Sequence, residues 1–190
     1  MLLLVGLGNP GSNYTNTRHN IGFKIIDAIN LHFKLSKQKP KFKGLLTTGN
    51  IESKKIYAIK PLTFMNNSGT AIKELIDYFK IDAKDVFVFH DDMDIDFGKI
   101  KVKFGGSSAG HNGIDSIDKF IGKDYSRVRV GIGHPKEKKK VNNHVLEDFK
   151  EDEEEKIKDI ADNIVKMIPT LIDKKIDLFS SKVNQNLNGI

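Results

Sequence analysis

The chain has 190 residues, carries a net charge of +6, and contains neither cysteine nor tryptophan. The lack of cysteine excludes disulfides, thiolate metal sites and a cysteine nucleophile, and it suits a reducing compartment, so we expect a cytoplasmic protein. The longest apolar run, Met1 to Val5, is far shorter than the ~20 residues of a membrane span or the ~7–15 residues of a signal-peptide core, so we expect no membrane association.

The chain opens with an apolar run, Leu2 to Val5, which is typical of a strand buried on both faces. The glycines Gly6, Gly8 and Gly11 that follow fit the dinucleotide-binding spacing G-x-G-x-x-G. That motif requires a helix to begin at the third glycine. Here the polar stretch from Ser12 to Arg18 intervenes, so we disfavour nucleotide binding and expect a ligand loop at the end of a buried strand.

The next segments alternate between helices and strands. Apolar residues spaced four apart predict a helix from Ile21 to Phe33 with Asn20 as its N-cap, and a basic linker follows at 37–43. Two strands joined as a hairpin are predicted at 45–51 and 56–59. A polar loop then leads into a helix marked by Ile72, Leu75, Ile76 and Phe79, and a buried strand is predicted at 86–89.

In the second half, apolar residues alternate with basic ones in two segments, 100–104 and 127–132. Both patterns predict strands with one basic face. Between them a glycine-rich turn leads into a helix, and after them the basic loop 136–140 precedes a long acidic-ended helix from Glu151. Pro169 is predicted to kink or end that helix, with a last helix from about Ile176.

This order of elements predicts an α/β fold. Strands alternate with helices apart from one hairpin, so we expect a single three-layer domain over residues 1–190. Its twisted sheet is expected to be mixed but mostly parallel, with helices on both faces.

Polar residues follow several of the predicted strands and turns, and they form a candidate catalytic set. Histidine is the side chain best suited to accept a proton at physiological pH, so His19 is a natural general base, and Asp91 is our choice for the carboxylate that fixes its tautomer. The amides of Asn9, Asn66 and Asn112 can hold a carbonyl or a peptide backbone. No serine lies in a nucleophile elbow, so we expect an activated water to attack an ester or similar acyl bond.

Duller interpretations stay open for each of these residues. Asn66 and Asn112 are both suited to capping helices, and Asp91 is suited to forming a turn. A metallohydrolase using His90, Asp91, Asp94 and His111 is one alternative enzyme. A non-enzymatic RNA-binding module is another alternative, supported only by the net charge, which a lysine-rich solvated surface also explains.

Several motifs in this order resemble the bacterial-type peptidyl-tRNA hydrolase family. They are Val5-Gly6-Leu7-Gly8-Asn9-Pro10-Gly11, Thr17-Arg18-His19-Asn20, Phe64-Met65-Asn66, His90-Asp91-Asp92, Gly110-His111-Asn112-Gly113 and Arg129-Val130-Gly131-Ile132-Gly133-His134-Pro135. The resemblance implies cleavage of the ester between a peptide and the 3′ end of tRNA, by a metal-independent monomer that needs no cofactor.

The resemblance also implies roles for individual residues. His19 resembles the family's catalytic base and Asp91 its supporting carboxylate. Asn9 occupies the position that separates blocked from free aminoacyl-tRNA. Positions that contact substrate or tRNA are matched by Tyr14, Phe64, Asn66 and Asn112, with Met65 and His111 lining the same cleft. Basic residues associated with the 5′ phosphate of tRNA are matched by Lys103 and Arg129.

Overall fold

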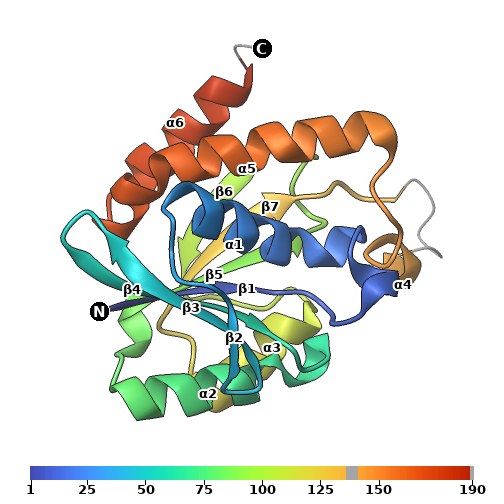
Figure 1. Cartoon of the computed structure of the whole chain (residues 1–190). Coiled ribbons are helices and arrows are strands. Elements are labelled where there is room, and N and C mark those ends of the chain that lie inside the picture. The colour runs from blue at the N-terminus through green and yellow to red at the C-terminus, as the bar shows by residue number, and fades with distance from the viewer. Residues whose placement is uncertain (136–140, 189–190) are drawn as a thin grey trace.

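The computed structural model describes residues 1–135 and 141–188. The predicted basic loop 136–140 lies outside these residues. Seven strands form one mixed sheet in the order β2-β3-β4-β1-β5-β7-β6, with helices on both faces (Figure 1). The strands are β1 (Leu2–Gly6), β2 (Lys39–Lys41), β3 (Gly44–Ile51), β4 (Lys54–Pro61), β5 (Val86–Asp92), β6 (Ile100–Phe104) and β7 (Ser126–Gly131).

Strand β1 lies inside the sheet and pairs in parallel with β4 and β5, and β5 pairs in parallel with β7. The pairs β2–β3, β3–β4 and β6–β7 are antiparallel, so only β3 and β6 run against the other five strands. The predicted fold class, a mixed and mostly parallel sheet between two helical layers, is confirmed. The carboxyl ends of the central parallel strands all point to the same side of the molecule, at the ends of the strands and not at the outer strands of the sheet.

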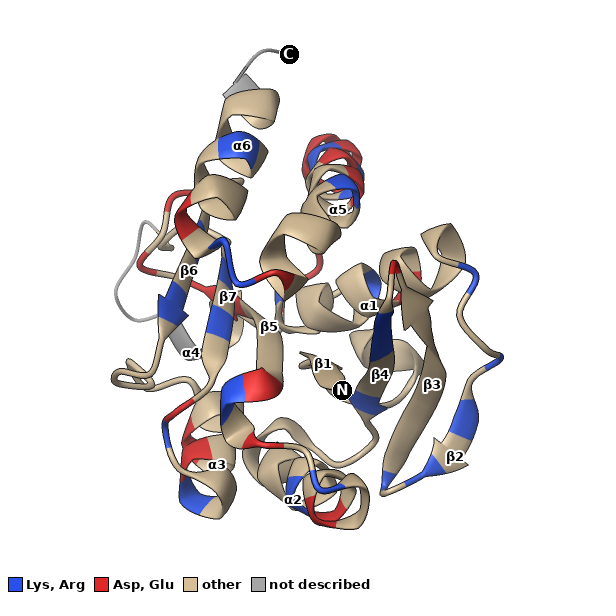
Figure 2. Ribbon diagram, turned by 90° about the vertical axis from the view of Figure 1, so that its left-hand side faces the viewer, with Lys and Arg blue, Asp and Glu red and all other residues tan. Residues whose placement is uncertain are grey.

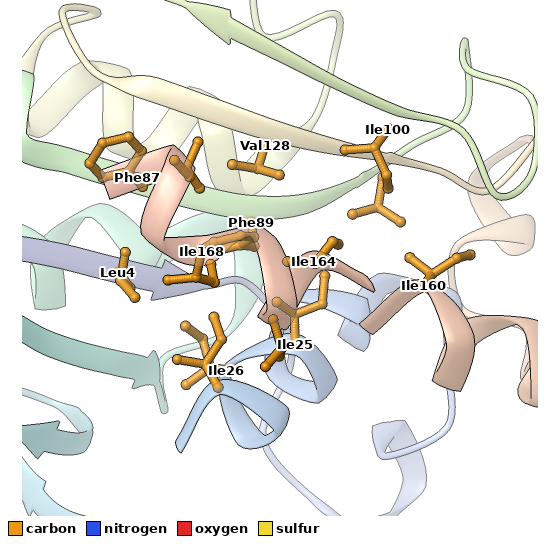
Figure 3. Packing of buried hydrophobic residues seen from close by; sticks show 14 of the residues in the cluster. Leu4, Ile25, Ile26, Phe87, Phe89, Ile100, Val128, Ile160, Ile164 and Ile168 are labelled. Atoms are coloured by element: carbon orange, nitrogen blue, oxygen red, sulfur yellow. The ribbon is translucent and has the colours of Figure 1, made fainter. Parts of the chain in front are cut away.

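The helical layers follow from the alternation of side chains along the strands. Leu2 and Leu4 of β1 join a core under α1 (Ile21–His32), α5 (Glu151–Ile172) and α6 (Ile176–Asn188). Leu3 and Val5 face the opposite core under α2 (Ser68–Phe79) and α3 (Asn112–Ile121). Figure 2 shows the two layers end-on, and Figure 3 shows α1 and α5 packing their isoleucines on the strands. Both faces of β1 are therefore dry, which explains its uninterrupted apolar sequence.

Two glycines allow α1 to cross β1 closely. A Cβ on Gly6 would lie 2.2 Å from the carbonyl oxygen of Gly22, and a Cβ on Gly22 would lie 2.4 Å from the amide nitrogen of Leu7. Gly6 therefore serves helix packing, and α1 begins at Ile21, ten residues after Gly11. This agrees with the prediction that the glycine spacing is not a nucleotide-binding motif.

Some predictions of local structure are wrong. Residues 39–41 form the edge strand β2 and not a linker, because Pro40 is tolerated where one strand edge has no partner. Helix α5 continues past Pro169 to Ile172, so the proline does not end the helix. The predicted basic face of β7 fails at Arg127, whose side chain is buried and paired with Asp118 at 2.7 Å.

The other sheet edge, β6, is covered by α6. The side-chain oxygen of Asn184 accepts the amide of Ile100 at 2.8 Å, and its side-chain nitrogen donates to the Ile100 carbonyl, also at 2.8 Å. The short helix α4 (Val141–His144) precedes α5. Among the residues described, none of the helices combines the length and the apolar character needed to cross a membrane.

Candidate active site

A cavity of about 350 Å³ lies where the carboxyl ends of the parallel strands meet. It collects eight of the predicted site residues, which are Asn9, His19, Phe64, Met65, Asn66, Asp91, His111 and Asn112. Loops after β1, β4 and β6 and the end of β5 each supply part of the wall. This is the position in which open α/β sheets bind their ligands.

His19 and Asp91 are in direct contact in this cavity. His19 lies in the short 3₁₀ helix η2 (Arg18–Asn20), and Asp91 lies within β5, which runs three residues further than the sequence predicts. His19 Nδ1 lies 2.8 Å from Asp91 Oδ1 and 2.9 Å from Oδ2. A carboxylate only accepts, so Nδ1 carries the proton, and Nε2 is the free ring nitrogen of a side chain that lines the cavity.

His111 contacts the same carboxylate. Its Nε2 lies 3.0 Å from Asp91 Oδ1, while its Nδ1 accepts the backbone amides of Gly113 and Ile114 at 3.1 and 3.3 Å. Accepting those amides requires an unprotonated Nδ1, so Nε2 carries the proton and donates to Asp91. His111, and not Asn112, is thus the side chain that caps α3, and a neutral His111 holds the carboxylate in place.

The surroundings of Asp91 favour its charged form. The carboxyl is buried, which by itself raises a pKa, but the imidazoles of His19 and His111 outweigh this effect and hold the pKa of Asp91 below its usual range. Neighbouring His90 behaves differently, because burial, with His111 adding to it, lowers the pKa of its imidazole to about 3. Its Nδ1 donates to the carbonyl of Asp91 at 2.7 Å, so His90 is a neutral structural histidine.

Asn9 is held on both its main chain and its side chain. The Asn20 side chain accepts the Asn9 amide at 2.8 Å and donates to the Asn9 carbonyl at 2.9 Å. Asn20 occupies the predicted N-cap position of α1, but its side chain makes no capping hydrogen bond there. The Asn9 Oδ1 accepts the Met65 amide at 2.8 Å. This contact leaves the side-chain NH₂ of Asn9 as a donor available to a ligand in the cavity.

The rim of the cavity carries exposed groups. Phe64 is 58% exposed and meets Tyr14 edge to face at 6.4 Å between ring centroids, although Tyr14 does not itself line the cavity. Asn66 and Asn112 are exposed, and their side-chain amides make no hydrogen bond to the residues that the structure describes. Aromatic and amide groups of this kind are suited to gripping a peptide main chain without selecting its side chains.

The two predicted phosphate contacts lie away from the cavity wall. Lys103 is exposed on β6, and Arg129 on β7 donates from Nε to Asp92 at 2.6 Å. Arg129 therefore touches a residue that lines the cavity, whereas Lys103 lies along the strand edge. Figure 2 shows basic residues on β6 and β7 together.

The ligand set of the alternative metallohydrolase, His90, Asp91, Asp94 and His111, is not assembled. Among residues 1–135 and 141–188, the ligand atoms of His19, Asp91 and His111 lie within 4.8 Å of one another, and His90 and Asp94 are not part of this group. A metal in this trio would need the lone pair of His111 Nε2, which the N-cap contact commits to a proton. The donor set therefore does not fit a metal unless α3 loses its cap.

The sequence analysis missed two sets of residues. Residues 144–149 bring Val145 and Leu146 to the cavity wall, and Met93 also lines it. Asn20 and Arg18 do not line the cavity but support the residues around it. Asn20 bonds to the main chain of Asn9, and Arg18 bonds to Glu153. Both residues belong to the Thr17-Arg18-His19-Asn20 motif, but the motif does not reveal which residues they contact.

Comparisons with known proteins agree with this geometry. A family model described as peptidyl-tRNA hydrolase matches residues 3–189. A peptidyl-tRNA hydrolase of Pelagibacter ubique is 71% identical, with 97% of this chain and 99% of the relative covered. One of Ehrlichia ruminantium is 46% identical over 95% and 93% of the two chains. The crystal structure of peptidyl-tRNA hydrolase from Acinetobacter baumannii superposes with a TM-score of 0.90 at 34% identity, covering 97% of this chain and 94% of that chain.

Proposed function

The chain belongs to the peptidyl-tRNA hydrolase family and hydrolyses the ester that joins a peptide to tRNA, and we propose that His19 activates the attacking water. The observation that carries this proposal is the His19–Asp91 hydrogen bond inside the cavity. It leaves Nε2 as the basic nitrogen next to the space that a substrate would occupy.

The proposed reaction has two proton transfers. His19 Nε2 takes a proton from water as the water oxygen attacks the ester carbon, and Asp91 stabilises the imidazolium that forms. The tetrahedral intermediate then collapses, and the 3′ oxygen of tRNA leaves with the proton from Nε2. General base catalysis of this kind contributes typically ~10²–10⁴-fold to a rate.

We assign the carbonyl and peptide contacts to the free amides. The Asn9 NH₂ faces the reacting carbonyl, where it can stabilise developing negative charge. Asn66 and Asn112 hold the peptide backbone, with Tyr14 and Phe64 at the rim. The amides of Gly113 and Ile114 at the start of α3 are not available to the substrate, because both donate to His111 Nδ1.

The first experiment replaces His19 by alanine and measures release of tRNA from peptidyl-tRNA. We expect turnover to be abolished while tRNA affinity stays within about twofold, because the imidazole is small relative to a nucleic-acid interface. Retained turnover in His19→Ala would refute the base assignment.

A second experiment compares the hydrolysis of N-blocked and of free aminoacyl-tRNA by the parent and by Asn9→Ala. We expect the ratio of the two rates to favour the blocked form in the parent and to be smaller in Asn9→Ala.

The rival functions are tested in the same assay. Exhaustive chelation should leave activity unchanged, since His111 Nε2 holds a proton that a metal would have to displace. Repeated release of tRNA by substoichiometric protein excludes a module that only binds RNA. We further propose that the chain acts as a single-domain monomer in the cytoplasm, because its own cavity holds the base, the carboxylate and the amides that the proposed reaction uses, and its substrate arises in translation.

A further inference from the structure

Residues 144–149, which we term the strap, pair with the loop that carries His19. The His19 amide donates to the Val145 carbonyl at 2.8 Å, and the Arg18 amide donates to the Glu147 carbonyl at 3.0 Å. The Phe149 amide completes the ladder by donating to the Asn16 carbonyl at 3.2 Å. At its other end the strap is tied to the end of β7, where His144 Nε2 lies 3.0 Å from the Gly133 carbonyl oxygen.

The strap forms one wall of the cavity. Val145 and Leu146 line it, and Leu146 is 48% exposed. The same residue, Val145, thus lines the cavity and offers its carbonyl to the His19 amide. A displacement of the strap would therefore move both the wall and the backbone of the proposed base.

One side chain locks this ladder to the body of the protein. Arg18 is 4% exposed, its guanidinium carbon lies 4.9 Å from the centroid of the Phe149 ring, and its Nη2 donates to Glu153 Oε2 at 2.8 Å. The same Oε2 accepts the Lys150 amide at 2.8 Å. Arg18 thus joins the η2 turn, the end of the strap and the first turn of α5.

Stability alone does not explain an arginine at this place. Its Nε and Nη1 are buried without a hydrogen-bond partner in the described part of the chain. A buried cation with one carboxylate partner costs desolvation free energy that an unbranched apolar side chain of similar length would not incur. The arginine is better explained by its contacts, which hold the η2 turn, the end of the strap and the first turn of α5 in one relative position.

We propose that Arg18 is a positioning residue, which holds the strap against the His19 loop so that the cavity wall and the base keep one relative position. The inference rests on the proposed role of His19. It predicts that losing the Arg18 contacts lowers kcat through misplacement of the base, and raises KM through displacement of Val145 and Leu146.

The test compares Arg18→Met, Arg18→Lys and Glu153→Gln with the matched control Glu154→Gln. Glu154 is the next residue of α5 and pairs with Lys24 of α1 at 3.0 Å, without touching the strap. We expect kcat/KM on peptidyl-tRNA to fall about tenfold or more in Arg18→Met, as misplacement by a fraction of an ångström costs rate. Arg18→Lys should recover part of the loss, Glu153→Gln should lose less, and Glu154→Gln should stay within twofold.

Amide hydrogen exchange provides the second readout. In Arg18→Met the His19 and Phe149 amides should exchange at least tenfold faster, relative to the sheet amides of β1, since their acceptors lie across the strap ladder. Unchanged exchange at these amides, or a kcat/KM within twofold of the parent, would overturn the proposal. If Arg18→Met fails to fold, equal effects of Glu153→Gln and Glu154→Gln on kcat/KM would overturn it instead.

This outcome is separable from that of the base assignment. A His19→Ala variant that still turns over refutes the base, whatever the exchange rates show. Intact strap protection in Arg18→Met refutes the positioning role, whatever the activity of His19→Ala.

Discussion

At the scale of single residues, Asp91 is shared by two histidines that have different tautomers. His19 donates from Nδ1 and His111 donates from Nε2, so both donors converge on one buried carboxylate. The proton positions follow from the other contact that each ring makes, and not from the rings themselves. Only His19 retains a free nitrogen on the cavity side, and this asymmetry selects it as the base.

Replacing Asp91 by asparagine should reduce kcat/KM by about 10²–10⁴-fold, because an amide neither carries the compensating charge nor enforces the Nδ1–H tautomer. The same variant tests the pKa of Asp91. That pKa is lowered on folding, so the stabilisation is present at neutral pH and is lost as the pH falls below about 4. Urea unfolding at a series of acid pH values should give a shallower loss of stability in Asp91→Asn than in the parent. Equal slopes would contradict the lowered pKa.

His111 can be divided into its two contacts by substitution. Asparagine is a good N-cap but is too short to reach Asp91, whereas alanine makes neither contact. We expect His111→Asn to be about 1 kcal/mol more stable than His111→Ala in urea unfolding, since a capping side chain contributes about that much. Both variants should lose similar activity, and a fully active His111→Asn would show that the contact with Asp91 is dispensable.

At the scale of elements, the crossing of α1 over β1 places the His19 loop. Gly22 meets backbone atoms on two sides, with an added Cβ only 2.4 Å from both Leu7 N and Phe89 O. For Gly8, by contrast, the three atoms nearest to an added Cβ all belong to the Phe23 ring, the closest at 2.8 Å. The Gly22 contacts involve the backbone of β5 and of Leu7, the residue directly after β1, whereas the Gly8 contact involves a side chain that can rotate.

We therefore expect Gly22→Ala to lower the free energy of unfolding by about 1–3 kcal/mol or more, as overpacking of a close crossing does. Gly8→Ala, the control, should cost clearly less. Denaturant unfolding monitored by circular dichroism measures both variants. Equal costs would mean that the backbone contact of Gly22 is relieved by a small shift of α1.

Periodicity in the sequence was enough to predict most of the elements. The apolar run of β1 and the isoleucine stripe of α1 report burial directly. The alternation in β6 reports it at Ile100 and in part at Val102, whereas Phe104 is exposed. Strand β2 was missed because Lys39, Pro40 and Lys41 are all exposed, so the sequence shows no alternation of apolar and polar residues there. Arg127 was misread because alternation cannot distinguish a solvated arginine from one that is buried with an acidic partner on another element.

The candidate site was predictable only in part, for a related reason. His19 and Asp91 were paired from chemistry, and the structure places them in contact, although their roles stay predictions. The bond between His111 and Asp91 joins segments from different loops, and no local pattern encodes it. The strap and Arg18 were missed for the same reason, because their contacts join distant parts of the chain, with Arg18 and Glu153 separated by 135 positions.

At the scale of the whole molecule, basic residues occur at both edges of the sheet. Lys103 and Arg129 lie at the β6–β7 edge, and Lys39 and Lys41 lie on β2 at the opposite edge (Figure 2). Arg129 is the basic residue of the first pair that contacts a cavity residue, Asp92. We assign the phosphates of tRNA to the β6–β7 edge.

Replacing Lys103 or Arg129 by alanine should weaken tRNA binding and reduce the slope of log affinity against log salt by about 1 each, because each removes one phosphate contact. Lys39→Ala is the control from the other edge and should leave the slope unchanged. Filter binding or fluorescence titration at several salt concentrations measures all three. If Lys39→Ala has the larger effect, the RNA lies over the opposite edge.

Asn184 of α6, which bonds to Ile100, and Pro40 of β2 both affect whether copies of the chain can associate through the edges of their sheets. At the β6 edge, the amide and carbonyl of Ile100 are already bonded to Asn184. At the β2 edge, Pro40 has no amide hydrogen to donate, and it lies between the like charges of Lys39 and Lys41. At these positions, both edge strands hinder a neighbouring molecule from adding a strand. The protein should therefore withstand crowding without forming fibrils, and this resistance should disappear when the C-terminal helix is removed.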